Sequence, residues 1–224
     1  MRPLLHCCVL LGALALLGAC RERPQGPPPG ISSLVAPGAH APLRIALVPF
    51  YAADGIARSA AGIDQALQSA LREHGRHLLV AIPTAVRDEL MPDDPLAASH
   101  LSSADLIAVR RRTGCDAALI GRIEQYQPYD PIRLGLTLYL VSCHDATVLW
   151  SATALLDGSR NDVQADIERW WRHAGGDATD GVNTWRQTLQ SPSQFQRYAA
   201  WRLVQTLTPP PDAPAATHAK TALR

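Results

Sequence analysis

Apolar residues along this chain form short runs, and helical periodicity appears between and after them. The first run after the amino-terminal segment, LRIALVPF, is almost continuously apolar, which is typical of a strand buried on both faces. A later run, IRLGLTLYLVS, alternates between leucines and other residues and predicts a strand with one apolar face. The predicted strands cover residues 43–50, 77–82, 115–126, 132–142 and 147–156.

Helical spacing of apolar residues is clearest in two segments between these strands. Residues 58–75 carry it and end at Gly75, a typical stop signal. The second helix begins with a capping pattern, Ser102 followed by Asp105, and ends before Gly114. Further helical segments are expected at residues 84–90, 162–173 and 194–207.

The predicted element order is β-α-β-α-β-β-β, followed by carboxy-terminal helices. Strands that alternate with helices run parallel with right-handed crossovers. The short links at 127–131 and 143–146 predict antiparallel hairpins. We therefore expect an α/β fold with a mixed five-stranded sheet, in a single domain of residues 43–207 whose carboxy-terminal helices pack on the sheet.

Both ends of the chain have a composition that cannot bury a core. Residues 20–42 are rich in proline and poor in large apolar residues, so we expect an extended tether after Cys20. Residues 208–224 have a similar composition and predict a disordered tail.

The amino-terminal segment is typical of an export signal. Its apolar run, from Leu4 to Leu17, follows Arg2 and is shorter than the about 20 residues that a membrane-spanning helix needs. The sequence LGAC, which ends at Cys20, resembles the lipobox of bacterial lipoproteins. This resemblance implies cleavage between Ala19 and Cys20, which removes a signal peptide of residues 1–19, and lipidation of the Cys20 thiol. The alternative is an ordinary secretory signal with a chance cysteine.

The lipobox resemblance also bears on location. Two or three acyl chains on Cys20 would hold the protein at a membrane more firmly than one chain could. Arg21 is not the aspartate that marks retention in the inner membrane of enteric bacteria. The resemblance therefore implies a periplasm-facing protein of the cell envelope, and it favours the outer membrane over the inner one.

Charge excludes one class of partner. The whole chain carries 21 lysines and arginines against 20 aspartates and glutamates, and Arg2 is the one charged residue of the signal segment, so the mature chain has a formal net charge of zero. Nucleic-acid binding needs clustered positive charge, so we expect no nucleic-acid partner. The short basic run at residues 110–112 falls in the last turn of a predicted helix, where cations complement the helix dipole.

After lipidation of Cys20, the mature chain has two further thiols, Cys115 and Cys143. If the hairpin pairs Tyr126 with Ile132, the two cysteines face each other across neighbouring strands. A cross-strand disulfide is then one interpretation in an oxidising compartment. Two unpaired buried thiols are the other.

The sequence contains no spacing typical of a catalytic, metal or cofactor site. Its histidines are scattered, and the zinc, phosphate-loop and nucleophile-elbow motifs are missing. The segment GGDATDG resembles a calcium loop only loosely and lacks most of the ligands. We therefore expect no catalytic residues, no metal and no cofactor.

Tryptophans gather in the last third of the chain. Trp170 and Trp171 are adjacent, so on a helix they point about 100° apart and cannot both face one core stripe. Trp171 with Arg172 is one candidate for a partner-binding surface, because exposed tryptophan and arginine are typical of interfaces. The alternative is that these tryptophans fasten the carboxy-terminal helices to the sheet.

Four segments, taken in order, resemble one lipoprotein superfamily: RIALVPF, LQSALREHG, TGCDAALIGRI and LYLVSCHDATVLWSA. The superfamily includes the curli-secretion lipoprotein, activators of penicillin-binding proteins and the amino-terminal domain of the Tol propeller protein. The resemblance covers residues 43–156 and implies a fold used for protein–protein contact. The turn HDATVLW lacks the glycine usual after Thr147.

These features predict a lipid-anchored envelope protein that presents an α/β binding or scaffold domain to a periplasmic or cell-wall partner. One alternative is a subunit of an oligomeric secretion or transport assembly, and the sequence leaves the oligomeric state open. A third alternative, an envelope enzyme acting on peptidoglycan or glycan, would require a cleft with paired carboxylates.

Overall fold

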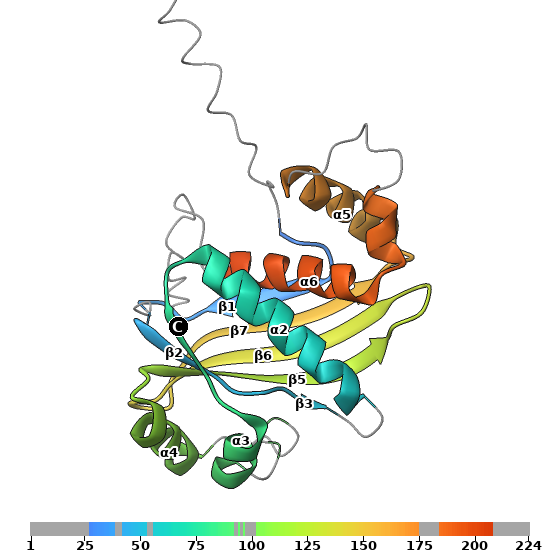
Figure 1. The fold of residues 1–224 in the computed structure, drawn as a ribbon. Helices are drawn as coiled ribbons and strands as arrows, with labels where there is room; N and C mark the ends of the chain where they lie inside the picture. The colour runs from blue at the N-terminus through green and yellow to red at the C-terminus, as the bar shows by residue number, and fades with distance from the viewer. Residues whose placement is uncertain are drawn as a thin grey trace, which may run out of the picture.

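The computed structural model describes residues 27–38, 42–52, 56–91, 94, 96, 102–174 and 184–207. Its centre is one seven-stranded sheet in the order β1-β7-β6-β5-β2-β4, with β3 paired to β5 (Figure 1). The strands are β1 (Ile31–Val35), β2 (Arg44–Leu47), β3 (Tyr51–Ala52), β4 (Leu78–Ala81), β5 (Ala117–Gln127), β6 (Arg133–Ser142) and β7 (Val148–Asp157). The helices are α2 (Ala57–His74), α3 (Thr84–Leu90), α4 (Ser103–Thr113), α5 (Asn161–His173), the 3-10 helix η1 (Trp185–Leu189) and α6 (Pro192–Thr206).

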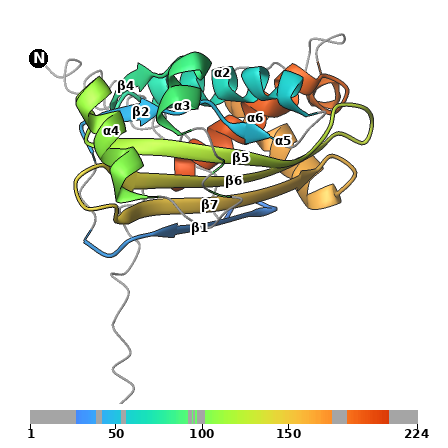
Figure 2. The ribbon, with the colours of Figure 1, turned by 90° about the horizontal axis from the view of Figure 1, so that it is seen from below.

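The mixed α/β sheet that the sequence predicts is confirmed. β2 runs parallel to β4 and β5, and β5, β6, β7 and β1 follow one another in antiparallel order (Figure 2). The predicted helix caps are also present: Ser102 Oγ accepts a hydrogen bond from the Asp105 amide at 3.1 Å, and Gly114 ends α4 with a φ of 65°. A positive φ strains residues with a Cβ atom, so glycine suits this end.

The predicted count of five strands is too low by two. Pro49 has no amide hydrogen, and the first predicted strand ends before it as β2. A separate short strand, β3, follows directly after the predicted range and pairs with β5. The second addition, β1, lies inside the predicted tether and pairs with β7. The folded domain therefore includes Ile31–Val35 and does not begin at residue 43.

The side chains of β1 explain why the hydrophobic pattern of the sequence did not predict this strand. The strand reads ISSLV, and its three central residues are exposed, so it carries little apolar signal. Its pairing instead satisfies backbone groups along the outer edge of β7, which any side chains permit.

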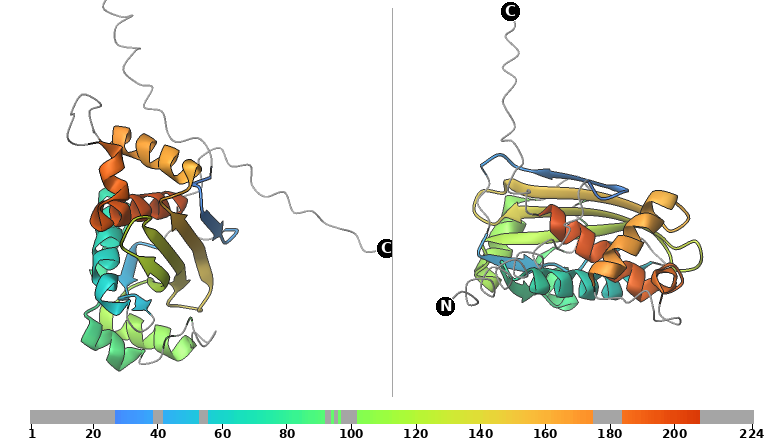
Figure 3. Two further views of the ribbon diagram at one scale, coloured as in Figure 1. Left: turned by 90° about the vertical axis from the view of Figure 1, so that its right-hand side faces the viewer. Right: turned by 90° about the horizontal axis from the view of Figure 1, so that it is seen from above.

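The two faces of the sheet are covered differently. On one face, α2, α5 and α6 enclose the larger core, which includes Leu136, Leu138 and Trp150. On the other face, α3 and α4 pack over β2, β3 and β5 around Val48, Leu106 and Ile120. Figure 3 shows α2 and α6 on one side of the sheet, and β7 and β1 without a helix on the other side.

Over β6, β7 and β1, no helix of the described residues covers the second face, and this part is called the open sheet face below. Among its large side chains, Leu34 is 68% exposed, Leu155 56% and Val148 42%. Tyr139, Ser151 and Leu34 follow one another across the paired strands. In the described parts of the chain, no helix is long and apolar enough to cross a membrane.

Candidate functional site

The carboxy-terminal cap, formed by α5, η1 and α6, holds the predicted partner surface in place. α5 buries Val163, Ile167 and Trp170 at helical spacing. Asp166 lies on the same buried side of the helix and is only 1% exposed. A buried carboxylate on an apolar face requires partners, because leaving it unpaired would be costly.

Those partners come mainly from α6. Arg202 Nε lies 2.7 Å from Asp166 Oδ2 as an ion pair, and the Tyr198 hydroxyl donates to the same oxygen at 2.8 Å. Arg202 and Arg169 each donate to the other carboxylate oxygen at 2.9 Å. Burial is the largest cause that raises the pKa of Tyr198, and the negative charge of Asp166 is the second. With its oxygens occupied in this way, Asp166 joins two helices and is poorly placed to act as a base.

Trp171 and Arg172 extend from this rigid cap. Trp170 is buried with its ring 5.8 Å from that of Tyr198, whereas Trp171 is half-buried against the main core. The Arg172 side chain is 60% exposed and lies 3.6 Å from Glu168. The two sequence interpretations therefore apply to different residues: Trp170 fastens the cap, and Trp171 with Arg172 reaches the surface.

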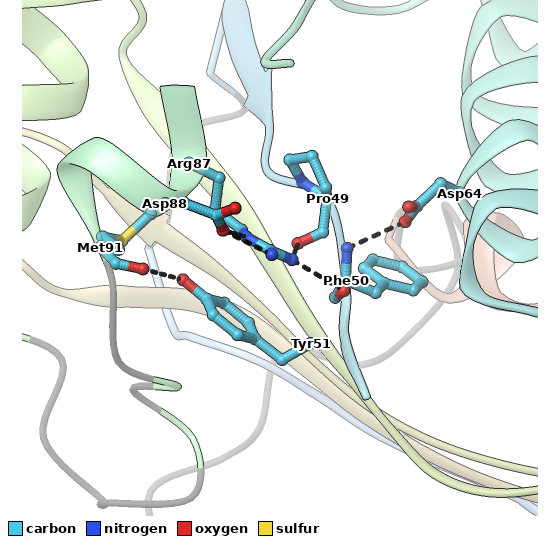
Figure 4. Close-up of polar contacts among 7 residues, drawn as sticks. All are labelled: Pro49, Phe50, Tyr51, Asp64, Arg87, Asp88 and Met91. Carbon is cyan, nitrogen blue, oxygen red and sulfur yellow. Dashed lines mark hydrogen bonds and ion pairs between the residues drawn. The ribbon is translucent and has the colours of Figure 1, made fainter. Parts of the chain in front are cut away.

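A second polar cluster surrounds the bend between β2 and β3 (Figure 4). The Phe50 amide donates to Asp64 Oδ1 on α2 at 3.1 Å. From the other side, Arg87 on α3 donates to the carbonyl oxygens of Pro49, at 3.4 Å, and Phe50, at 3.1 Å. One helix from each layer thus holds the backbone where proline interrupts the strand.

Two groups of this cluster, Asp64 and Tyr51, have pKa values well above their ordinary ones. Burial raises the pKa of Asp64 to about 6, although the Phe50 amide and Arg87 act in the opposite direction. Burial also raises the pKa of Tyr51 to about 12, and the Tyr51 hydroxyl donates to the Met91 carbonyl at 2.9 Å. The Arg87 guanidinium lies 4.7 Å from the centre of the Tyr51 ring. These groups stabilise a structural bend.

Phe50 itself explains two residues of the superfamily resemblance. Its ring packs directly over Gly121, where a Cβ would lie 2.5 Å from a ring carbon. The aromatic residue after Pro49 and the glycine of "LIGRI" are therefore one packing unit between neighbouring strands. Local sequence patterns do not link the two residues, because they are far apart in the chain.

The cysteine register that the sequence suggested is wrong. Tyr126 pairs with Leu134 rather than Ile132, and an irregularity between Ile123 and Gln125 shifts the pairing again. As a result, the Cys143 amide bonds to the Asp116 carbonyl at 2.8 Å.

Cys115 and Cys143 are both free and buried in the smaller core, so the disulfide interpretation is replaced by two unpaired thiols. Burial is the largest cause that raises the pKa of Cys143 to about 11, and the electrostatic effect of Cys115 is the second. A thiol with such a pKa is a poor nucleophile at neutral pH.

Several predicted features lie outside the described residues. These are the signal peptide with its cleavage site after Ala19, the lipidated Cys20, the segment GGDATDG and the tail 208–224. Within the described residues, no three histidine, cysteine or acidic side chains come together as metal ligands.

No model of a known protein family matches the sequence, and no curated protein matches it significantly. Solved structures do. A PelC variant from Paraburkholderia phytofirmans, described as a dodecamer, is 13% identical with a TM-score of 0.50, and the match covers 80% of this chain and 98% of that one. Lipoprotein GNA1162 from Neisseria meningitidis is 17% identical with a TM-score of 0.39, covering 62% of this chain and 99% of that one. The carboxy-terminal domain of LpoB from Escherichia coli is 16% identical with a TM-score of 0.38, covering 54% and 87%.

The likeness to PelC shows that the two chains share a fold. One of the matching structures, GNA1162, is described as a lipoprotein. The sequence resemblance was limited to residues 43–156, about half of the chain, whereas the match to PelC covers 80% of it. The shared fold therefore extends beyond the segment in which the sequence suggested it.

Sequence reasoning missed Asp64, Arg87 and Asp166. One signal was available for Asp166: it falls on the helical stripe of Val163, Ile167 and Trp170, where an acidic residue predicts a buried partner. No local pattern marks Asp64 or Arg87, because both bind backbone atoms that are distant in sequence.

Proposed function

We propose that this chain is a lipid-anchored protein of the bacterial envelope that acts through protein–protein contact rather than catalysis. The observation that carries the proposal is the open sheet face, where Leu34, Val148 and Leu155 remain exposed beside the edge strand β1. Exposed apolar side chains next to an unpaired strand edge are typical of an interaction surface.

The anchoring part of the proposal rests on the lipobox that ends at Cys20. Arg21 favours an outer-membrane location for the mature, periplasm-facing protein. Metabolic labelling with an alkyne fatty acid tests the anchor: wild type should be labelled, and Cys20→Ala should not. Separation of the two membranes then tests the location.

A second contact surface is proposed at Trp171 and Arg172 on α5. The buried contacts of Asp166 with Arg202 and Tyr198 hold this helix against α6, so a partner would meet a preorganised surface. The exposed guanidinium beside a half-buried indole provides the polar and apolar contacts common in interface hot spots.

The deciding experiment places a photo-crosslinking amino acid at Thr153, at Trp171 or at Arg72, in full-length protein in native membranes. Thr153 is exposed on the open sheet face, and Arg72 is an exposed control position on α2. Crosslinks to an envelope protein from the first two positions and not from the control support the proposal. It fails if all three positions crosslink alike or none does, or if Trp171→Ala and Arg172→Ala leave every recovered partner unchanged.

A second candidate function is that of a repeating subunit in an oligomeric secretion or transport assembly. It is favoured because the match covers nearly all of a PelC chain that is described as a dodecamer. The two outer strands of the sheet, β1 and β4, also leave edges at which copies could meet.

Mass photometry of the detergent-solubilised protein tests this candidate. Discrete oligomers that dissociate in Leu155→Arg but persist in Tyr129→Arg, a control on an exposed loop, would support it. A monomer at micromolar concentration would exclude it.

A further inference from the structure

Two adjoining recesses cross helix α4 on the surface of the smaller layer. One has a volume of about 580 Å³ and is lined by Arg110, Arg111, Asp116 and His144, among others. The second, of about 460 Å³, is lined by Arg111, Arg112 and residues of α3 and α4. Arg111 and Ile107 line both recesses, so they form one continuous trough, named here the arginine trough.

Positive charge in this trough is largely uncompensated. Arg110, Arg111 and Arg112 are all exposed, and in the described part of the chain none forms an ion pair with a carboxylate. Arg44 adds a further guanidinium at the same end, where it donates to the Thr113 carbonyl at 3.4 Å.

Among the described residues that line the trough, Asp116 is the one acidic residue, and it already has two partners. It accepts a hydrogen bond from the Arg44 amide at 3.0 Å and lies 3.8 Å from His144 Nε2. The helix dipole of α4 accounts for some preference for cations in its last turn. It does not account for an adjoining recess lined by an imidazole from the β6–β7 turn.

We propose that the arginine trough binds an acidic glycan, a linear sugar polymer that carries carboxylate groups. Successive residues on a helix point about 100° apart, so Arg110, Arg111 and Arg112 cannot converge on one anion. They can contact successive anions along a chain that crosses α4. A guanidinium group also matches a carboxylate through two parallel hydrogen bonds, which suits Arg better than Lys for this role.

The shape of the trough favours a glycan over an acidic peptide. An extended peptide is usually bound at a strand edge, and a helical peptide in an apolar groove. The described lining of the trough has no strand edge, because it consists of α4, Leu90 of α3, the α4–β5 link and the β6–β7 turn. Its apolar residues, such as Ile107 and Leu90, lie beside the arginines and do not form a purely apolar groove. A stiff polymer with one charge per repeat also loses less conformational entropy on binding than a flexible peptide does.

Topology argues against a headgroup of the protein's own membrane, and this step rests on the proposed anchoring at Cys20. Ile31 enters the sheet opposite Ala154, near the end of β7, whereas the trough adjoins the turn before β7 begins. The six residue steps of strand from Val148 to Ala154 span about 20 Å. The trough therefore lies at the end of the sheet away from the point where the chain arrives from its anchor.

The test uses the full lipidated chain in nanodiscs and a fluorescent decamer of galacturonate as the probe. Arg110→Gln combined with Arg111→Gln should weaken binding at least tenfold. The matched control, Arg72→Gln with Arg197→Gln, removes the same charge from exposed positions of α2 and α6 and should change binding less than twofold. Raising the salt concentration should weaken binding of the wild type, because exposed charges are screened.

Competition by other anions decides the ligand class. Poly-glutamate of equal charge and phosphatidylglycerol vesicles should each compete at least tenfold less well than unlabelled galacturonate decamer. The proposal is overturned if either competes equally well, if the control pair weakens binding as much as the trough pair, or if the decamer does not bind wild type.

Crosslinking and mass photometry of the same variants keep this proposal separate from the proposed function. Trough variants that lose the glycan but keep their protein contacts would support both proposals. Wild type that binds the decamer but gives no crosslink from Thr153 or Trp171 would refute only the proposed contact function. Circular dichroism melts of each variant establish that it is folded.

Discussion

Asp64 offers a sharp test of how the bend between β2 and β3 is held. The Asp64 carboxylate accepts a hydrogen bond from the Phe50 amide, and burial raises the pKa of this carboxyl group to about 6. Because the folded state binds this proton more tightly than the unfolded chain, the contribution of Asp64 to stability is fully present below pH 3.8 and is lost as the pH rises through about 6. Asp64→Asn keeps an oxygen that can accept the Phe50 amide, but it removes the titration.

The size of the effect follows from the shift. Raising the pKa from 3.8 to about 6 corresponds to about 3 kcal/mol, at about 1.36 kcal/mol for each pKa unit. Integrating the proton linkage places about 2 kcal/mol of this between pH 4.5 and pH 7.5. Relative to wild type, Asp64→Asn should therefore gain about 2 kcal/mol in its free energy of unfolding across that interval.

Urea denaturation of wild type and variant at several pH values measures this difference directly. Comparing the two proteins at each pH removes any constant effect of asparagine itself. Glu89→Gln, which removes an exposed acid from α3, is the matched control for the loss of one carboxylate. If the advantage of Asp64→Asn is flat or shrinks as the pH rises, the carboxylate is not held in the way that its burial and contacts indicate.

Two further changes test the packing. Asp166→Ala leaves Arg202 buried without its carboxylate and should lower the free energy of unfolding by about 3–5 kcal/mol in urea denaturation. The double variant Asp166→Leu with Arg202→Met should recover most of that loss. An equal loss in the single and the double variant would contradict the view that the unpaired Arg202 charge causes it. Gly121→Ala places a Cβ 2.5 Å from the Phe50 ring and should cost about 1–3 kcal/mol in thermal or urea unfolding. Adding Phe50→Leu should relieve part of this cost, and an unaffected Gly121→Ala protein would refute the close contact.

The two proposed kinds of surface lie on different parts of the molecule. The open sheet face covers β6, β7 and β1, whereas the arginine trough crosses α4 beside the β6–β7 turn. One protein could therefore contact a partner and an acidic glycan at the same time. The net charge of the mature chain gave no sign of this, because a sum of zero conceals local clusters.

Sequence patterns alone determined most of the secondary structure and the fold class. The predicted helix at 84–90 is α3, and Ser102 and Gly114 bound α4 as expected. The leucines of 132–142 alternate because one side of β6 faces the main core. These features were predictable because side-chain periodicity and helix capping act over a few neighbouring residues.

Only the tertiary structure decided the pairing register, the extra strand and the polar clusters. The irregularity near Gln125 moved Cys143 opposite Asp116, and β1 formed on the edge of β7 with hardly any apolar pattern. Asp64, Arg87 and Asp166 acquired their partners through folding. Backbone hydrogen bonds between distant strands, and the burial that raises the pKa of Asp64, arise only once remote segments meet, so no local pattern could encode them.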